Sequence, residues 1–155
     1  RRATGSSSAA TSMVTMSVLF VGLGEMQSLS AEASPGPNAM VVNVTGQQWV
    51  WTFSYPQNGN VESDQLYLPV NRQVVFHVTS KDVIHSFWVV ELGIKVDANP
   101  GQVAKGGVLP DRVGTYTVRC AELCGLLHAH METQAHVVSK ADFAAWMAAQ
   151  GGPAA

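Results

Sequence analysis

The sequence predicts a mainly β protein, an antiparallel sandwich or barrel, preceded by a single transmembrane helix. Short apolar runs separated by clusters of Pro, Gly, Asn and Asp recur through residues 39–139. Regularly spaced short strands of this kind are typical of sandwiches and barrels. An apolar stretch at residues 13–27, extended by Ala9 and Ala10, approaches the roughly 20 residues that a membrane span needs.

The composition favours a chain that is partly covered by a membrane or by a partner. Charged residues make up 13% of the 155 residues and hydrophobic residues 46%, whereas soluble domains usually carry about 25% charged residues. This length is enough to bury one core without disulfides. The net charge of −2 gives no basis for nucleic-acid binding.

The N-terminal apolar segment, residues 1–33, is expected to contain the transmembrane helix. Glu25 and several small polar residues weaken the match, so a surface helix and the core of a signal peptide are the alternatives. If the segment spans a membrane, Arg1 and Arg2 place its start on the cytoplasmic side and the rest of the chain outside. Residues 34–38, rich in Pro and Gly, are interpreted as a linker.

The domain expected at residues 39–139 consists of short strands. Within residues 49–55 every second residue is aromatic, so these four rings share one face of a strand. Further strands are expected at residues 41–44, 65–70, 73–79, 83–92, 114–119 and 134–138. Residues 140–155 are expected to form a C-terminal helix and tail, with Ser139 as the helix cap.

Metal-ligating side chains are concentrated between Cys120 and Met131. This segment, Cys-Ala-Glu-Leu-Cys-Gly-Leu-Leu-His-Ala-His-Met, holds two thiols, two imidazoles and a thioether. Thiolate and thioether are soft donors, and Met is a weak axial ligand of copper but rare in structural zinc sites. With His85 from an earlier strand, the pattern matches the way in which blue-copper, or cupredoxin-like, sandwiches assemble a copper site.

The second cysteine favours a site for two metal ions. One copper in a blue-copper site needs one thiolate, whereas Cys120 and Cys124 on one loop can bridge two copper ions with one His for each. A disulfide between them would close a very short loop and constrain little of the unfolded chain. Their spacing also differs from the C-x-x-C of thioredoxin-like and most zinc sites.

Four motifs together resemble subunit II of cytochrome c oxidase. They are Gly46-Gln-Gln-Trp-Val-Trp51, His85-Ser-Phe-Trp88, Asp97-Ala-Asn-Pro-Gly101 and the pattern C-x-E-x-C-G-x-x-H-x-x-M that starts at Cys120. The resemblance runs from about residue 38 to the C-terminus, and the last motif is very specific. It implies a cupredoxin-like domain that carries a binuclear copper centre, CuA.

The resemblance implies a role for each matched side chain. The implied copper ligands are His85, Cys120, Glu122, Cys124, His128 and Met131. The two cysteines would bridge the coppers and each His would bind one of them. Met131 would be the weak ligand of one copper, and the backbone carbonyl of Glu122 would serve the other. The side chain of Glu122 would point toward a magnesium or manganese ion shared with subunit I.

The resemblance also implies partners and a location. Trp49 would be the point at which an electron from cytochrome c enters the subunit. The electron would then pass to haem in subunit I, where O2 is reduced to water and protons are translocated, with subunit III as a further partner. The chain would lie in the cell membrane, inner or plasma, with its copper domain on the outer, periplasmic side.

Two departures from the family limit what is carried over. The family normally has two membrane helices before the copper domain, and at most one is visible here. The acidic residue that many members carry near the start of the second helix has no evident match before Glu25. No proton-channel residue is therefore assigned.

Two other classes of function are open at this point. A single-copper cupredoxin could act as a soluble electron carrier, with its second cysteine unused and the apolar N-terminus cleaved as a signal. A zinc or thiol enzyme could use Cys120 and Cys124 directly. A quinol-oxidase subunit II is disfavoured because that branch lacks these cysteines, and the large propeller domain of nitrous oxide reductase has no counterpart here.

Overall fold

The structure, a computed structural model, describes residues 5–33, 36 and 38–153. The chain divides into two compact units, Arg1–Glu32 and Ala33–Ala155. Helix α1 (Gly5–Ala33) makes up the described part of the first unit. Arg1 and Arg2, and most of the expected linker, lie outside the described residues.

Helix α1 contains one stretch, Ala9–Met26, that is long and apolar enough to cross a membrane. None of its side chains is buried within the structure. Large apolar side chains such as Phe20 and Leu23 are exposed along it. This apolar helix matches the single N-terminal helix that the sequence predicts.

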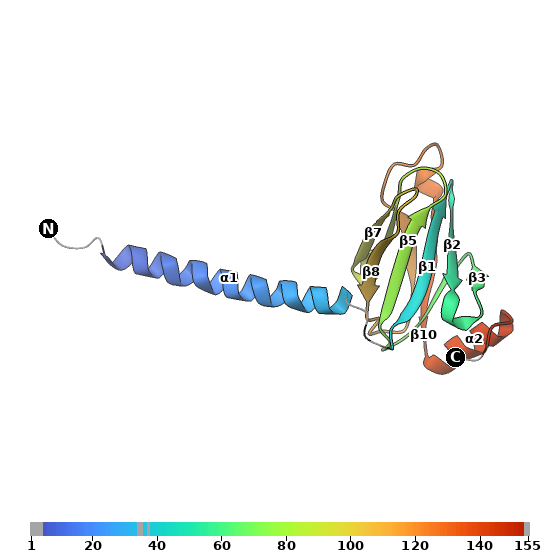
Figure 1. Cartoon of the computed structure of the whole chain (residues 1–155), viewed down its shortest axis with the longest axis horizontal. Helices are drawn as coiled ribbons and strands as arrows, with labels where there is room; N and C mark the ends of the chain where they lie inside the picture. The colour runs from blue at the N-terminus through green and yellow to red at the C-terminus, as the bar shows by residue number, and fades with distance from the viewer. Residues whose placement is uncertain (1–4, 34–35, 37, 154–155) are drawn as a thin grey trace. The chain divides into compact units, whose positions relative to one another are not determined.

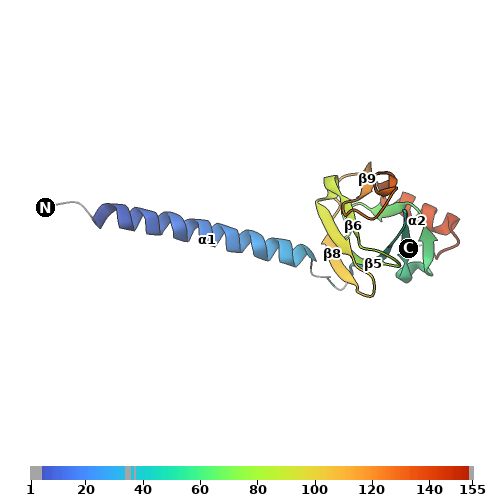
Figure 2. The same ribbon diagram turned by 90° about the horizontal axis from the view of Figure 1, so that it is seen from above.

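The second unit is a sandwich of two five-stranded sheets, with strand orders β3-β2-β1-β5-β8 and β4-β10-β9-β6-β7 (Figures 1 and 2). The strands are β1 (Met40–Gln47), β2 (Val50–Tyr55), β3 (Val61–Ser63), β4 (Leu66–Pro69), β5 (Val74–Ser80), β6 (His85–Val89), β7 (Ile94–Ala98), β8 (Ala104–Val108), β9 (Gly114–Cys120) and β10 (Glu132–Val138). Three short 3-10 helices and one α-helix complete the unit: η1 (Pro56–Asn58), η2 (Val90–Leu92), η3 (His128–His130) and α2 (Lys140–Ala149).

Aromatic rings from both sheets meet in the core. Trp51 and Phe53 of β2 point inward and pack edge to face against Phe87 of β6, with ring centroids 5.8 and 6.2 Å apart. Such contacts add about 0.5–1.5 kcal/mol each beyond the burial of area. Three of the four aromatic rings that the sequence places on one face lie in β2. The fourth, the half-buried Trp49, lies in the preceding turn because β2 begins at Val50.

The mainly β sandwich predicted from the sequence is confirmed, although it is not wholly antiparallel. Strand β1 pairs in parallel with β5, and β4 pairs in parallel with β10. Alternation of apolar residues does not reveal strand direction, because parallel and antiparallel strands both place successive side chains on opposite faces. The pairing of β1 with β5 sets Gly46 opposite Ser80, so the turns after these two strands lie at the same end of the sandwich.

Helix α2 begins directly after Ser139, which is its cap as predicted: the Asp142 N–H donates to Ser139 Oγ at 3.1 Å. Phe143 and Met147 of this helix are buried against the sandwich. The loop between β9 and β10 lies at the opposite end of the sandwich from α2 (Figure 1). Helix α2 therefore closes the end of the core that is remote from this loop.

The hydroxyl of Tyr55 joins the two sheets. It donates to Tyr67 O at 3.1 Å and accepts from Tyr67 N–H at 2.8 Å. Tyr55 lies in the first sheet and is fully buried, while Tyr67 belongs to β4 of the second. We expect Tyr55→Phe to lower the free energy of unfolding by about 1–2 kcal/mol, because two partly buried backbone groups of Tyr67 lose their partner.

Urea unfolding of the full chain measures this change. Tyr116→Phe is the matched control, since the Tyr116 hydroxyl makes one exposed hydrogen bond to Arg112 O. The control should change stability by no more than about 0.5 kcal/mol. Equal effects of the two substitutions would show that the Tyr55 hydroxyl does not tie the sheets together.

Candidate metal centre

Strand pairing brings His85 and the loop between β9 and β10 together. His85 is the first residue of β6, and Cys120 is the last residue of β9. Phe87 of β6 lies opposite Cys120, and the Ala121 N–H donates to Ser86 O at 2.9 Å. His85 is therefore held beside the start of the loop by the sheet itself.

The loop between β9 and β10, residues 121–131, is closed at its base by a backbone hydrogen bond. The Cys120 N–H donates to Met131 O at 3.1 Å, one residue before β10 begins. Within the loop, the His128 N–H donates to Gly125 O and the Met131 N–H to His128 O. These bonds turn the chain back on itself and direct the predicted ligands toward one another.

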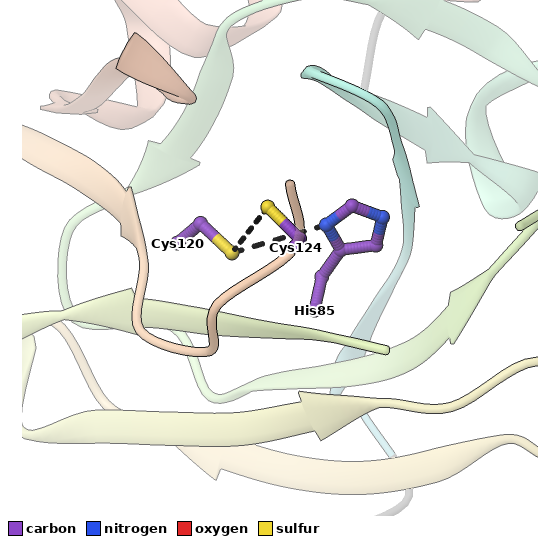
Figure 3. Close-up of side chains that lie close together, drawn as sticks. All are labelled: His85, Cys120 and Cys124. Atoms are coloured by element: carbon purple, nitrogen blue, oxygen red, sulfur yellow. Dashed lines mark hydrogen bonds between the residues drawn. The ribbon is translucent and has the colours of Figure 1, made fainter. Parts of the chain in front are cut away.

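The two sulfur atoms lie between two imidazoles. Cys120 Sγ and Cys124 Sγ are 3.7 Å apart. His85 Nδ1 lies 3.8 Å from Cys120 Sγ, and His128 Nδ1 lies 3.5 Å from Cys124 Sγ. The side chains of His85 and the two cysteines point toward one another in Figure 3. Their ligand atoms all lie within 4.8 Å of one another, a spacing that a metal ion can bridge.

Two further predicted donors lie at the edges of this cluster. Met131 is fully buried, with its Sδ 3.8 Å from Cys124 Sγ. The backbone carbonyl of Glu122 lies 3.2 Å from Cys120 Sγ, while the side chain of Glu122 is exposed. The structure thus places one thioether beside the second thiol and one carbonyl oxygen beside the first.

Both cysteines are buried free thiols. Burial, together with the hydrogen bond and the charge of Cys120, raises the pKa of Cys124 to about 12. Burial therefore favours the protonated, neutral form of the Cys124 thiol at neutral pH. Because the thiolate is the metal ligand, a metal that binds here displaces a proton.

Asp82 contacts the ring nitrogen of His85 that does not face the sulfur atoms. The Nε2 of His85 and Asp82 Oδ1 are 2.8 Å apart, so this ring nitrogen is engaged and Nδ1 is left to face the sulfurs. Burial opposes ionisation of Asp82, but hydrogen bonds from Gln48, His85 and Val83 lower its pKa to about 2. A carboxylate behind a histidine is the usual way in which proteins orient an imidazole toward a metal.

The turn between β1 and β2 lies against the loop. Trp49 Nε1 donates to Cys124 O at 3.2 Å, and Gln48 Nε2 donates to the same oxygen at 2.8 Å. Trp49 was predicted as a functional residue, whereas Gln48 and Asp82 were not. The signals that could have found them are their positions, Gln48 inside the Gly-Gln-Gln-Trp motif and Asp82 three residues before His85.

The donors gathered here fit copper. Two thiols, two imidazole nitrogens and a thioether form a soft to borderline set, which suits copper better than magnesium or calcium. Each thiol has one imidazole nitrogen beside it, at 3.8 Å for Cys120 and 3.5 Å for Cys124. His130, the other histidine of the loop, is exposed.

Comparison with known sequences supports the same assignment. The family described as "Cytochrome C oxidase subunit II, periplasmic domain" matches residues 60–138. Cytochrome c oxidase subunit 2 of Thermostichus vulcanus is 41% identical over 126 residues, which cover 81% of this chain and 37% of that relative. Its counterpart from Alkalihalophilus pseudofirmus is 37% identical over 112 residues, covering 72% and 33%. The chain spans about a third of the length of these curated relatives.

The fold agrees with that of a solved relative. The crystal structure of the periplasmic domain of subunit II of cytochrome oxidase from Bradyrhizobium japonicum superposes with a TM-score of 0.72 at 30% sequence identity. The match covers 77% of this chain and 96% of that domain, which confirms the predicted cupredoxin-like sandwich. The matched family, the close relatives and the shared fold together show that this chain belongs to the cytochrome c oxidase subunit II family.

Proposed function

We propose that this chain is the electron-accepting subunit of a cytochrome c oxidase. It takes electrons from cytochrome c at a binuclear CuA centre and passes them to haem in subunit I, where O2 is reduced to water and protons are translocated. The observation that carries this proposal is the pair of free thiols 3.7 Å apart, with one imidazole beside each.

The proposed ligands divide into two similar sets. Cys120 and Cys124 would be shared by the two coppers, with His85 as a ligand of one copper and His128 as a ligand of the other. Met131, which lies beside Cys124, and the Glu122 carbonyl, which lies beside Cys120, would be the weaker ligands. When bound, the copper pair supplies reversible one-electron storage at this end of the sandwich.

The protein contributes rigidity to electron transfer. The ligands come from a strand end and from a loop closed at its base. They therefore keep similar positions in the oxidised and the reduced state of the site. Trp49 is half-buried and reaches Cys124 O through its indole N–H. This contact supports Trp49 as the residue through which the electron enters.

Exposed apolar side chains support a protein partner at this end. The loops that supply or touch the ligands expose large apolar side chains, and such clusters on a surface mark interaction sites. They are Val50, Val83, Ile84, Leu123, Leu126 and Leu127. In this proposal these six side chains contact the oxidase subunits that receive the electron, and cytochrome c binds over Trp49.

The side chain of Glu122 is the proposed ligand of a magnesium or manganese ion at the boundary with subunit I. Its exposed position supports this assignment. Magnesium prefers about six oxygen ligands in octahedral geometry. A single carboxylate supplies too few, so the remaining ligands would come from the partner subunit and from water.

We place the protein in the cell membrane, anchored through Ala9–Met26, with the copper domain on the periplasmic side. The apolar helix and the membership of a family defined by a periplasmic domain support this location. The low content of charged residues, 13%, agrees with a chain covered by lipid and partner subunits.

The copper content of the full chain tests the proposal. We expect two coppers per chain, with one unpaired electron shared between them in the electron paramagnetic resonance spectrum. One copper with an ordinary four-line pattern would instead support the single-copper carrier. Cys124→Ser should abolish or convert the shared-electron signal because it removes one bridging sulfur; an unchanged spectrum contradicts the bridge.

Trp49→Phe should slow electron transfer from reduced cytochrome c while the copper pair still forms. The substitution removes the indole N–H that contacts Cys124 O but keeps an aromatic ring. Stopped-flow reduction of the copper-loaded chain gives the rate. Trp88→Phe is the matched control, because Trp88 is a half-buried tryptophan of β6 that donates no hydrogen bond to the loop. Equal rates in the two variants would exclude the role of Trp49.

Copper uptake should release protons, because the buried Cys124 thiol, with a pKa of about 12, must lose its proton to bind. The affinity for copper should therefore rise as the pH rises from about 6 to about 8. Calorimetric titration in buffers with different heats of ionisation counts the released protons. Uptake without proton release would mean that the thiols are not the ligands.

A further inference from the structure

We propose that Gln48 is a positioning residue of the metal centre. The side chains of Gln48 and Trp49, together called the clasp, both donate a hydrogen bond to the backbone carbonyl of Cys124. Gln48 also positions His85 through Asp82. The inference rests on the proposed function only for the identity of the metal, because the hydrogen bonds that carry it lie within the protein.

The clasp places two donors on one acceptor. Gln48 Nε2 and Trp49 Nε1 lie 2.8 and 3.2 Å from Cys124 O. A carbonyl oxygen has two lone pairs, so this acceptor is fully used by the clasp. Cys124 is only 3% exposed, and both hydrogen bonds to its carbonyl oxygen are partly buried.

The backbone of Gln48 reaches the other side of the centre. The Gln48 N–H donates to Asp82 Oδ2 at 2.7 Å, and Asp82 Oδ1 lies 2.8 Å from His85 Nε2. One residue of the turn between β1 and β2 thus contacts Cys124 through its side chain and is linked to His85 through the carboxylate of Asp82. The two ligands are 39 positions apart in the sequence.

Gly125 shows that the loop is fitted closely to the clasp. A Cβ atom at this position would lie 2.9 Å from Gln48 Nε2 and 3.3 Å from Trp49 Cζ2. Its φ of +117° also disfavours any residue with a side chain. The glycine that follows Cys124 therefore lets the backbone approach both side chains of the clasp.

The clasp contacts the middle of the loop, which lies several residues from the hydrogen bond at the base of the loop. The base of the loop is tied by the Cys120–Met131 hydrogen bond, but Cys124 lies four and seven residues from these ties. Its neighbours Leu123 and Leu126 are 78% and 90% exposed and contribute little packing. The clasp therefore adds two hydrogen bonds that hold the backbone of Cys124, and with it the second sulfur, against the turn between β1 and β2.

Gln48→Glu tests the clasp with little change in shape. The carboxylate cannot donate to Cys124 O and repels it, while the backbone bond to Asp82 is kept. Gln47→Glu is the matched control: it makes the same charge change one residue away, at an exposed side chain without a hydrogen bond among the described residues. Loss of an interaction that orients ligands costs 10- to 100-fold in metal affinity, so about tenfold faster copper release to excess chelator is expected from Gln48→Glu.

A second measurement needs no metal. In the metal-free full chain in detergent, Gln48→Glu should react several-fold faster with a thiol reagent at a fixed pH, because Cys124 is no longer held inward. Gln47→Glu should match the unsubstituted chain in both assays, and a cooperative urea transition should show that both variants are folded. Unchanged copper release and thiol reactivity in Gln48→Glu would overturn the clasp.

The two proposals fail in different ways. One copper per unsubstituted chain would contradict the binuclear centre. The difference in thiol reactivity between Gln48→Glu and Gln47→Glu would still test the clasp. Two coppers per chain with identical behaviour of Gln48→Glu and Gln47→Glu leave the binuclear centre intact and remove the clasp alone.

Discussion

Two buried thiols held 3.7 Å apart on one loop are the constraint on which the rest of the site depends. A pair of thiolates at this distance and burial would repel each other strongly unless a cation lay beside them. The two cysteines are positioned by strand ends, by the Cys120–Met131 hydrogen bond and by the contacts to Cys124 O. The fold of these strands and of the loop thus sets the positions of the ligands.

Both sheets contribute to that arrangement. The second sheet supplies His85 and the ends of the loop, while the first supplies the turn that contains Gln48 and Trp49. Parallel pairing of β1 with β5 brings this turn next to Asp82. The aromatic core, in which Trp51 packs against both His85 and Phe87, fixes the position of one sheet relative to the other. Stability of the sandwich and geometry of the site are therefore linked.

Much of this could be predicted from the sequence because the signals are local. The Cys-rich segment, the aromatic alternation and the Ser139 cap each lie within a few residues. The parallel pairings and the roles of Asp82 and Gln48 depend instead on contacts between distant strands. Asp82 resembles any other surface acid in the sequence, and only the fold brings its carboxylate to the far side of His85. Trp49 was predicted from its motif, but its bond to Cys124 O required the fold.

X-ray absorption at the copper edge of the copper-loaded full chain can show whether two copper ions share the two sulfur atoms. If they do, each copper has two sulfur neighbours from the two cysteines at bonding distance, together with scattering from a second copper. A single thiolate sulfur per copper, without copper–copper scattering, would contradict this sharing.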